Sequence, residues 1–193
     1  MSGWLYDGQH GFRPEYSFES QVVTVCQGIA DLLDEGARTD AIIIDFSNVF
    51  DLVSHDRLLT KITATGVDLT LLVWVKEFLL GRSQRVRIDG QLSEEFRVKS
   101  GVSLGSVLGP SLFLAYVNGI WRNTEPNKRL FADDCIIYRK IMDNSDIDKL
   151  QTDTDSLREW AVANKMKINP GKSKAVSFTK ARVKERIRYF LYF

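Results

Sequence analysis

The sequence has few of the features on which secreted and membrane-spanning proteins depend. It contains two cysteines in 193 residues. Both Cys26 and Cys135 stand among apolar neighbours, so we expect reduced core thiols in an intracellular protein rather than a disulfide framework. No apolar run reaches the roughly 18 residues that a membrane span needs, and the N-terminus has no signal-peptide pattern.

Two familiar enzyme patterns are present only in part. Residues 170–173 (PGKS) resemble the end of a phosphate-binding loop, but Met166 occupies the position five residues before Gly171 where glycine is required. Residues 54–56 (SHD) contain the residue types of a hydrolase triad, yet consecutive residues cannot adopt the geometry of the relay. Neither pattern supports a P-loop nucleotidase or a serine hydrolase.

An excess of one charge is also missing, since the net charge is only +1. The basic residues are nevertheless unevenly placed, because residues 165–188 contain nine lysines and arginines against one acid, Glu185. This asymmetry favours contact with a phosphate backbone, although a solvated tail explains it equally well. Three more arginines lie within residues 82–87, on a predicted hairpin arm that turns at Gly90.

The alternation of apolar patterns predicts a single α+β domain. With 44% hydrophobic and 26% charged residues, the chain can build one core. The predicted helices and strands are a helix over 17–35, a strand over 41–44, helices over 55–65 and 69–80, a helix from about Pro110 to Gly119, a helix starting with a capping-box-like pattern at 145–148, and a strand over 174–178. This order is typical of an antiparallel sheet that carries helices on one face.

The richest local pattern is Phe131-Ala132-Asp133-Asp134. Apolar segments of strand length, 129–132 and 135–138, flank it without glycine or proline, which predicts a hairpin with the aspartates at its bend. Two adjacent carboxylates repel each other unless a cation lies between them. Asp-Asp is also ordinary turn chemistry, so the pair by itself leaves both interpretations open.

A third carboxylate favours the metal interpretation. Ala41-Ile42-Ile43-Ile44 has the pattern of a buried strand and runs directly into Asp45. If this strand lies beside the hairpin, Asp45 comes close to Asp133 and Asp134, and the three supply the hard oxygen ligands that Mg²⁺ or Mn²⁺ prefers. Two-metal phosphoryl or nucleotidyl transfer is the chemistry that uses such a set.

The chain resembles the reverse transcriptases of non-LTR retrotransposons. The resemblance covers roughly residues 9 to 178 in five blocks that follow the family's order. These blocks are QHGFRP at 9–14, DFSNVFD at 45–51, SGVSLGSVLGP at 100–110, FADD at 131–134 and the region 160–174.

The resemblance implies a polymerase palm that uses two divalent ions, Mg²⁺ or Mn²⁺, with an RNA template, a DNA primer and dNTP as partners. Asp45 and Asp133 would bind both metals, Asp134 would support one of them, and Lys172 would protonate pyrophosphate. A solvated turn lysine is the plain alternative for Lys172.

The resemblance also implies a nucleotide site formed by Arg13, Phe46, Phe50, Leu104 and Gly105. Arg13 would pair with the triphosphate, and Phe50 would exclude a 2′-hydroxyl by its bulk. The plain alternatives are a solvated loop arginine and a core aromatic. Leu104 stands where the family usually has glutamine, and leucine cannot make the hydrogen bond expected of that amide.

The expected boundaries are a reverse transcriptase domain at 1–180, with part of the fingers and the palm, and a basic, then apolar tail at 181–193. We expect no thumb and no membrane contact, and the oligomeric state is left open. Because Leu104 replaces the usual glutamine, a catalytically inactive relic, or a domesticated fold that binds nucleic acid or protein, is the alternative to an RNA-directed DNA polymerase.

Overall fold

The computed structural model describes residues 5–121, 128–180 and 189. Within this part of the chain no helix is both long and apolar enough to cross a membrane. The contacts divide the chain into two compact units, one of residues 48–117 and the other of residues 2–47 with 118–193.

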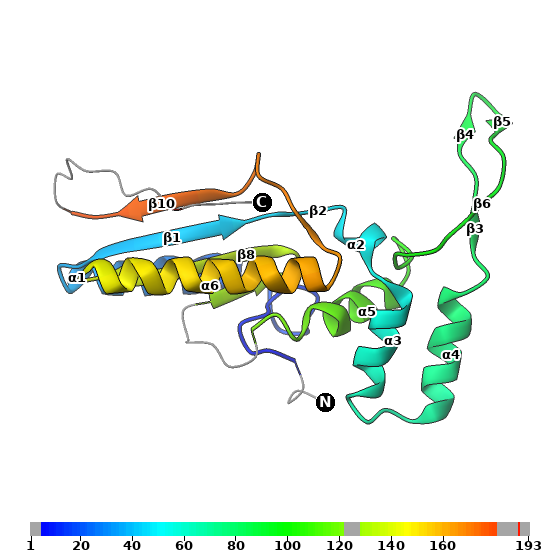
Figure 1. The fold of residues 1–193 in the computed structure, drawn as a ribbon, viewed down its shortest axis with the longest axis horizontal. Helices are drawn as coiled ribbons and strands as arrows, with labels where there is room; N and C mark the ends of the chain where they lie inside the picture. The colour runs from blue at the N-terminus through cyan, green and yellow to red at the C-terminus, as the bar shows by residue number, and fades with distance from the viewer. Residues whose placement is uncertain (1–4, 122–127, 181–188, 190–193) are drawn as a thin grey trace. The chain divides into compact units, whose positions relative to one another are not determined.

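The larger unit is built on a four-stranded antiparallel sheet in the order β10-β1-β8-β7 (Figure 1). Its strands are β1 (Arg38–Ile44), β7 (Lys128–Phe131), β8 (Asp134–Ile141) and β10 (Lys174–Phe178). The central strand β1 pairs with β8 from Arg38 opposite Ile141 to Ile44 opposite Cys135. A short ladder of β2 (Phe46–Ser47) with β9 (Lys167–Ile168) continues beyond β1. The predicted strands and the α+β class are confirmed.

Two long helices cover this sheet, α1 (Phe18–Asp34) and α6 (Asn144–Ala163). On α1, Ile29 packs in one core cluster with Ala41 and Tyr138, which face each other across β1 and β8. On α6, Asp153 pairs with Arg139, the neighbour of Tyr138 on β8. Successive residues of a strand point to opposite faces. The two helices therefore lie on opposite faces, whereas the sequence pattern predicted helices on one face.

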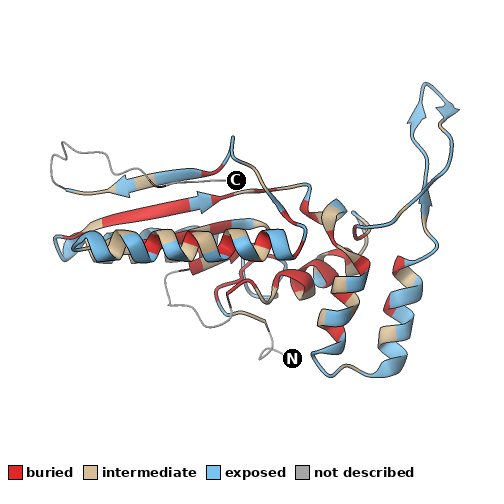
Figure 2. Cartoon of the chain, in the orientation of Figure 1, coloured by how far each residue is buried: buried red, intermediate tan, exposed pale blue. Residues whose placement is uncertain are grey.

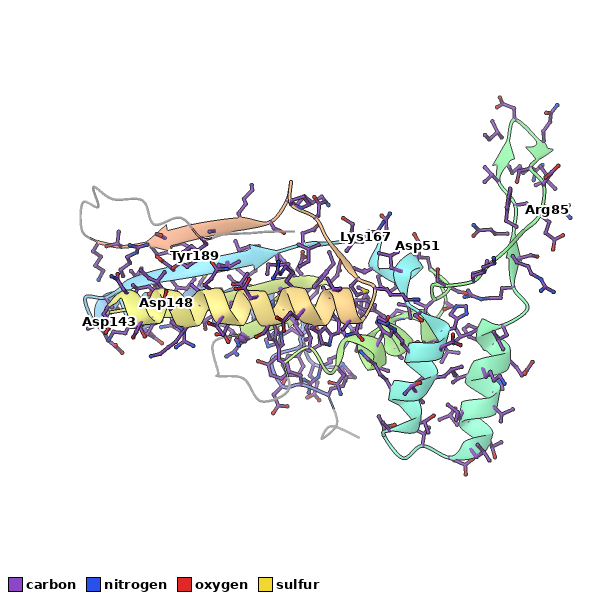
Figure 3. The ribbon with its side chains drawn as sticks, in the orientation of Figure 1. Asp51, Arg85, Asp143, Asp148, Lys167 and Tyr189 are labelled. Carbon is purple, nitrogen blue, oxygen red and sulfur yellow. The ribbon has the colours of Figure 1, made fainter. Side chains whose placement is uncertain are left out.

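The ends of these helices follow their local chemistry. Ser17 caps α1 in a capping box with Ser20, and Gly36 follows the helix at a φ of +76°, which glycine adopts without strain. The cap of α6 is Asp143, whose carboxylate accepts from the backbone N–H groups of Ser145 and Asp146 (Figure 3). The predicted start at 145–148 is therefore two residues late, because the aspartate before it is the better-placed acceptor.

One core prediction is wrong. Cys135 is buried and unpaired as expected, but Cys26 is exposed. The inner face of α1 is instead set by Gln21 and Ile29, the two buried residues of that helix. Cys26 lies about 100° further round the helix than Val25, which packs on the core, so it borders solvent.

The unit of residues 48–117 is helical and carries a hairpin arm. Its helices are α2 (Val49–Leu52), α3 (His55–Thr63), α4 (Leu69–Leu79) and α5 (Leu108–Val117), which confirms the two predicted helices in the middle of the chain. The arm contains β3 (Ser83–Gln84), β4 (Arg87–Ile88), β5 (Gln91–Leu92) and β6 (Phe96–Arg97), with Gly90 at its turn as predicted.

Burial separates the structural centre of each unit from its surface (Figure 2). In the sheet unit β1 is the most buried strand, with Ala41, Ile42 and Ile44 each 0% exposed. In the helical unit Phe113 of α5 is 0% exposed, whereas all residues of the four arm strands are exposed. Asp45, one of the catalytic candidates, thus follows directly on the most deeply buried strand of the sheet unit.

Candidate active site

Asp45 follows directly on the buried strand β1, and its backbone is fixed from both sides. Its carbonyl accepts from the N–H of Asn169 at 2.8 Å, and its N–H donates to Ser173 Oγ at 3.3 Å. Because Ile44 lies opposite Cys135 in the β1–β8 ladder, Asp45 emerges beside Asp134. The expectation that these strands are neighbours is confirmed.

The Asp45 carboxylate is only partly satisfied. Its side chain is 20% exposed, and its Oδ2 is buried with no hydrogen-bond donor. The nearest cation is Lys172, whose Nζ lies 3.6 Å from Oδ2 and whose side chain is 69% exposed. At this distance Lys172 and Asp45 form an ion pair but no hydrogen bond. A buried carboxylate oxygen in this state attracts a cation, since leaving it unpaired is costly.

The aspartate turn, residues 131–134, carries the other two carboxylates. Phe131 pairs with Asp134, so Ala132 and Asp133 form a two-residue hairpin loop. Burial is the largest cause that raises the pKa of both Asp133 and Asp134 above the ordinary value, and the negative charge of Asp45 raises both further. Lys172 acts in the opposite direction on both. The three carboxylates and this lysine therefore share one electrostatic field.

These carboxylates have the chemistry of a divalent-metal site, but they do not form a preorganised coordination site. Among the described residues, no three His, Cys, Asp or Glu side chains are gathered closely enough to hold an ion. The residues nevertheless fit such an ion in two respects, because their donors are hard oxygens and Asp45 has an orphaned buried oxygen.

A mostly apolar hollow of about 380 Å³ borders Asp134 within the sheet unit. It lies between α1 and the sheet, and its lining includes Phe18, Cys26, Ile43 and Asp134. Burial and then the charge of Asp45 raise the pKa of Asp134, which stands beside these apolar residues.

Arg13 and Phe46 are the two predicted nucleotide-binding residues in the sheet unit, and the side chains of both contact other parts of the protein. Arg13 donates to the carbonyl oxygens of Tyr6 at 3.1 Å and Gln9 at 3.2 Å, and its guanidinium lies over the ring of Tyr16. Phe46 is 5% exposed and meets the ring of Trp160 edge to face. Arg13 thus stabilises the N-terminal loop, and Phe46 contributes to the core beneath the site.

The other three predicted contacts belong to the helical unit. Phe50 lies against the ring of Phe113, with 4.8 Å between ring centroids. Leu104 is 70% exposed, and Gly105 has a φ of +79° with open space where a Cβ would stand. The glycine loop, residues 101–105, therefore presents Leu104 outward.

The glycine loop is held by two side chains that the sequence did not single out for this role. Arg82 donates to the Gly101 carbonyl and, at 2.7 Å, to Ser103 Oγ. His55 Nε2 lies 2.9 Å from the same carbonyl. Arg82 was predicted on the surface arm together with Arg85, and in fact it turns toward the loop, whereas Arg85 pairs with Glu95 on the arm (Figure 3). No local pattern links residues so far apart in the chain.

Gln9 is the second feature that the sequence did not reveal. It is 2% exposed, and its side-chain amide forms hydrogen bonds with the backbone of Ala132 in the aspartate turn.

In the basic stretch, residues 165–188, Lys180 pairs with Asp34 on the surface. Four of the nine basic positions of that stretch, and the tail predicted at 181–193 apart from Tyr189, lie outside the described residues.

Comparison with known sequences places these features in a family. The chain matches the family described as "Reverse transcriptase (RNA-dependent DNA polymerase)" over residues 5–190. It is 32% identical over 183 residues to the probable RNA-directed DNA polymerase from transposon X-element of Drosophila melanogaster. It is 30% identical over 184 residues to the RNA-directed DNA polymerase from mobile element jockey of Drosophila funebris. Both alignments cover 90% of this chain but 20% of the relative, so the chain spans about a fifth of the length of these relatives.

Solved structures with a similar fold come from telomerase. Apo telomerase of Candida tropicalis, truncated from its C-terminal domain, matches with a TM-score of 0.64 at 15% identity, over 94% of this chain and 38% of that one. Telomerase of the same organism in complex with a fragment of telomeric RNA matches with a TM-score of 0.67 at 13% identity, over 94% and 32%. These neighbours show the fold, and the match over residues 5–190 shows the descent. The chain belongs to the reverse transcriptase (RNA-dependent DNA polymerase) family, and its relatives are polymerases of transposons and mobile elements.

Proposed function

We propose that this chain carries the catalytic palm of an RNA-directed DNA polymerase, which transfers a nucleotide from dNTP to a primer 3′-hydroxyl on an RNA template. The observation that carries the proposal is the shared field of Asp45, Asp133 and Asp134 at the neighbouring ends of β1 and β8. We place this activity inside the cell, where RNA templates and dNTP are available.

Asp45 and Asp133 would hold two divalent cations, Mg²⁺ or Mn²⁺, with Asp134 supporting one of them. When bound, such ions activate the attacking hydroxyl and neutralise the leaving pyrophosphate. The orphaned Oδ2 of Asp45 supports this assignment, because a cation would satisfy an oxygen that no hydrogen-bond donor reaches. The negative charge of Asp45, which adds to burial in raising the pKa of Asp133 and Asp134, supports it as well, because a cation would relieve that repulsion.

Lys172 is suited to supply a proton to the departing pyrophosphate. Its ammonium is 3.6 Å from Asp45 and its side chain is 69% exposed, so it can turn from the carboxylate to an incoming phosphate. Arg13 would pair with the triphosphate, which requires it to exchange its contacts with the carbonyls of Tyr6 and Gln9.

Phe50 would exclude a 2′-hydroxyl, and Phe46, Leu104 and Gly105 would border the nucleotide. The ring contact with Phe113 supports the role of Phe50, because it limits the space into which that ring could retreat. The open space at Gly105 lets a ligand approach its backbone. Phe46 acts as a support from the core, since its ring is buried.

One observation favours a second candidate, a fold that binds nucleic acid without polymerising. Leu104 is 70% exposed at the position where the family usually has glutamine, and leucine provides no hydrogen bond to a nucleotide. In the polymerase proposal this side chain would border the nucleotide by apolar contact alone.

Primer extension on an RNA template, with dNTP and Mg²⁺ or Mn²⁺, tests both candidates. The parent chain is compared with Asp133→Ala, with Leu104→Gln, and with Asp148→Ala, which removes an exposed carboxylate near the N-terminal end of α6 (Figure 3). Extension that survives Asp148→Ala and disappears with Asp133→Ala supports the polymerase. Extension that appears only with Leu104→Gln indicates an intact fold with an altered site. If every variant binds primer–template and none extends it, the second candidate holds.

A further inference from the structure

The aspartate turn contains a backbone conformation that its sequence does not favour. Ala132 has a φ of +56°, in the left-handed region that glycine adopts readily and alanine does not. A residue in this region relaxes to negative φ unless its surroundings hold it. Because Asp133 is the next residue, any relaxation at Ala132 redirects the carboxylates that follow.

The turn also leaves polar backbone groups in a buried place. Ala132 is 6% exposed, and as a loop residue of the hairpin it has no partner in the β7–β8 ladder. Buried N–H and C=O groups require hydrogen-bond partners. The partner here comes from the other end of the chain.

Gln9 satisfies both groups of Ala132 at once. Its Oε1 accepts from Ala132 N–H at 2.9 Å and from Gly11 N–H at 2.8 Å, and its Nε2 donates to the Ala132 carbonyl at 3.3 Å. Two N–H donors facing one oxygen fix the orientation of the amide, because a flipped amide would place donor against donor.

The segment that carries Gln9 is itself pinned to the edge of the sheet. His10 N–H donates to the Leu130 carbonyl and Leu130 N–H donates to the Gly8 carbonyl, both at 2.8 Å, beside a parallel bridge between Gln9 and Leu130. Gly11 lies so close that a Cβ there would stand 2.2 Å from Ala132 N. Gln9 therefore has no freedom to follow the turn if the turn relaxes.

We infer that Gln9 is a positioning residue for the carboxylates of Asp133 and Asp134, acting through the backbone of Ala132. It stabilises the left-handed conformation that sets the direction of the turn, and it does not touch metal or substrate. The catalytic part of this role rests on the proposed function, whereas the conformational part does not.

Hydrogen exchange followed by mass spectrometry tests the conformational part. In Gln9→Leu, the amides of Asp133 and Asp134, to which the Gln9 side chain makes no hydrogen bond, exchange about 10- to 100-fold faster, as expected when a buried amide network is lost. Gln21→Leu is the matched control, because Gln21 is also buried in the sheet unit and its Oε1 has no hydrogen-bond partner. Equal protection at the turn in both variants overturns the inference.

A second variant separates positioning from general loss of stability. Adding Ala132→Gly to Gln9→Leu restores slow exchange at Asp133 and Asp134, since glycine takes positive φ without strain. If Gln9→Leu does not fold, Gln9→Glu keeps the acceptor for both N–H groups and is compared instead. Faster exchange throughout the sheet in every Gln9 variant, without rescue by the glycine, shows a merely structural role and overturns the inference.

Primer extension tests the catalytic part on the same proteins. Gln9→Leu lowers kcat at least about tenfold while KM for dNTP changes little, and Ala132→Gly recovers part of kcat, because misdirected carboxylates weaken the transition state rather than nucleotide binding. Unchanged kcat with a loosened turn overturns the catalytic part. If the parent extends no primer, the proposed function fails, and the exchange results still decide whether Gln9 holds the turn.

Discussion

The aspartate turn and the glycine loop are both held by side chains that are distant in sequence, but by different means. The turn is held by Gln9, a neutral amide that is 2% exposed and both donates and accepts. The loop is held by Arg82, a partly exposed cation that can only donate, together with His55, whose Nε2 lies beside the same Gly101 carbonyl. A donor and acceptor together fix the backbone from two sides, whereas a donor fixes only the oxygens it reaches.

The two kinds of anchor suit the residues that the turn and the loop carry. The turn carries the carboxylates that the proposed function requires to keep a constant direction, and its backbone is held by buried hydrogen bonds. In the loop Gly101 is anchored, yet Leu104 three residues later is 70% exposed. A region anchored at one end can adapt to a ligand at the other.

The largest expected effect comes from removing the cation that holds the loop. Arg82→Leu leaves the buried Gly101 carbonyl without its charged donor, and we expect the free energy of unfolding in urea to fall by about 2–3 kcal/mol. Arg85→Leu is the control, because that arginine is 49% exposed in its surface pair with Glu95 and should cost at most about 1 kcal/mol. Equal losses would mean that Arg82 does not anchor the loop.

A smaller effect is the difference in stability that we expect between alanine substitutions at Gly101 and at Gly105, the two glycines of the loop. Gly101 and Gly105 have φ of +88° and +79°, but only at Gly101 would a Cβ meet backbone, 3.0 Å from Asp51 Cα. Gly105→Ala should cost about 1–2 kcal/mol for the left-handed conformation, and Gly101→Ala should cost more because the clash adds to it. Urea titration of both variants measures the difference. A Gly105→Ala that is the more destabilising of the two would contradict the anchoring of the loop at Gly101.

In the aspartate turn the reverse substitution, alanine to glycine, should increase the stability of the protein. Ala132→Gly removes the strain of a positive φ, and we expect a gain of about 0.5–1 kcal/mol, because glycine's larger entropy in the unfolded state offsets part of the relief. Thermal unfolding of the parent and the variant checks the sign. A loss of stability would show that Ala132 is not strained in the folded protein.

The smallest expected effect is a pH dependence of stability that arises from His10, the residue after Gln9. The pKa of His10 is lowered by its burial first, and then by the charges of Arg129 and Arg13. The folded state thus prefers neutral His10, so this contribution to stability is complete above the unfolded pKa and is lost as pH falls through the folded pKa. The stability difference between the parent and His10→Asn should therefore decrease from pH 7 to pH 5 in urea titrations. A difference that increases toward pH 5 would contradict this.

Much of the fold was predictable because its signals are local. The run of residues 41–44 and its aspartate, the hairpin around Asp133 and the helix after Ser17 are confirmed, since periodicity and capping are properties of neighbouring residues. The exposed Cys26 and the helices on both faces of the sheet were not predictable, because burial on a helix depends on how it is rotated against its partner.

The sequence by itself determined the chemistry of the candidate site, which consists of three carboxylates at the ends of strands with motifs in the order of a reverse transcriptase. Only the tertiary structure decided what holds that chemistry in place. Gln9 meets Ala132 across 123 residues, and Arg82 meets Gly101 across 19. Such hydrogen bonds leave no period or spacing in the sequence, because they exist only once the sheet and the helices bring distant backbone groups together.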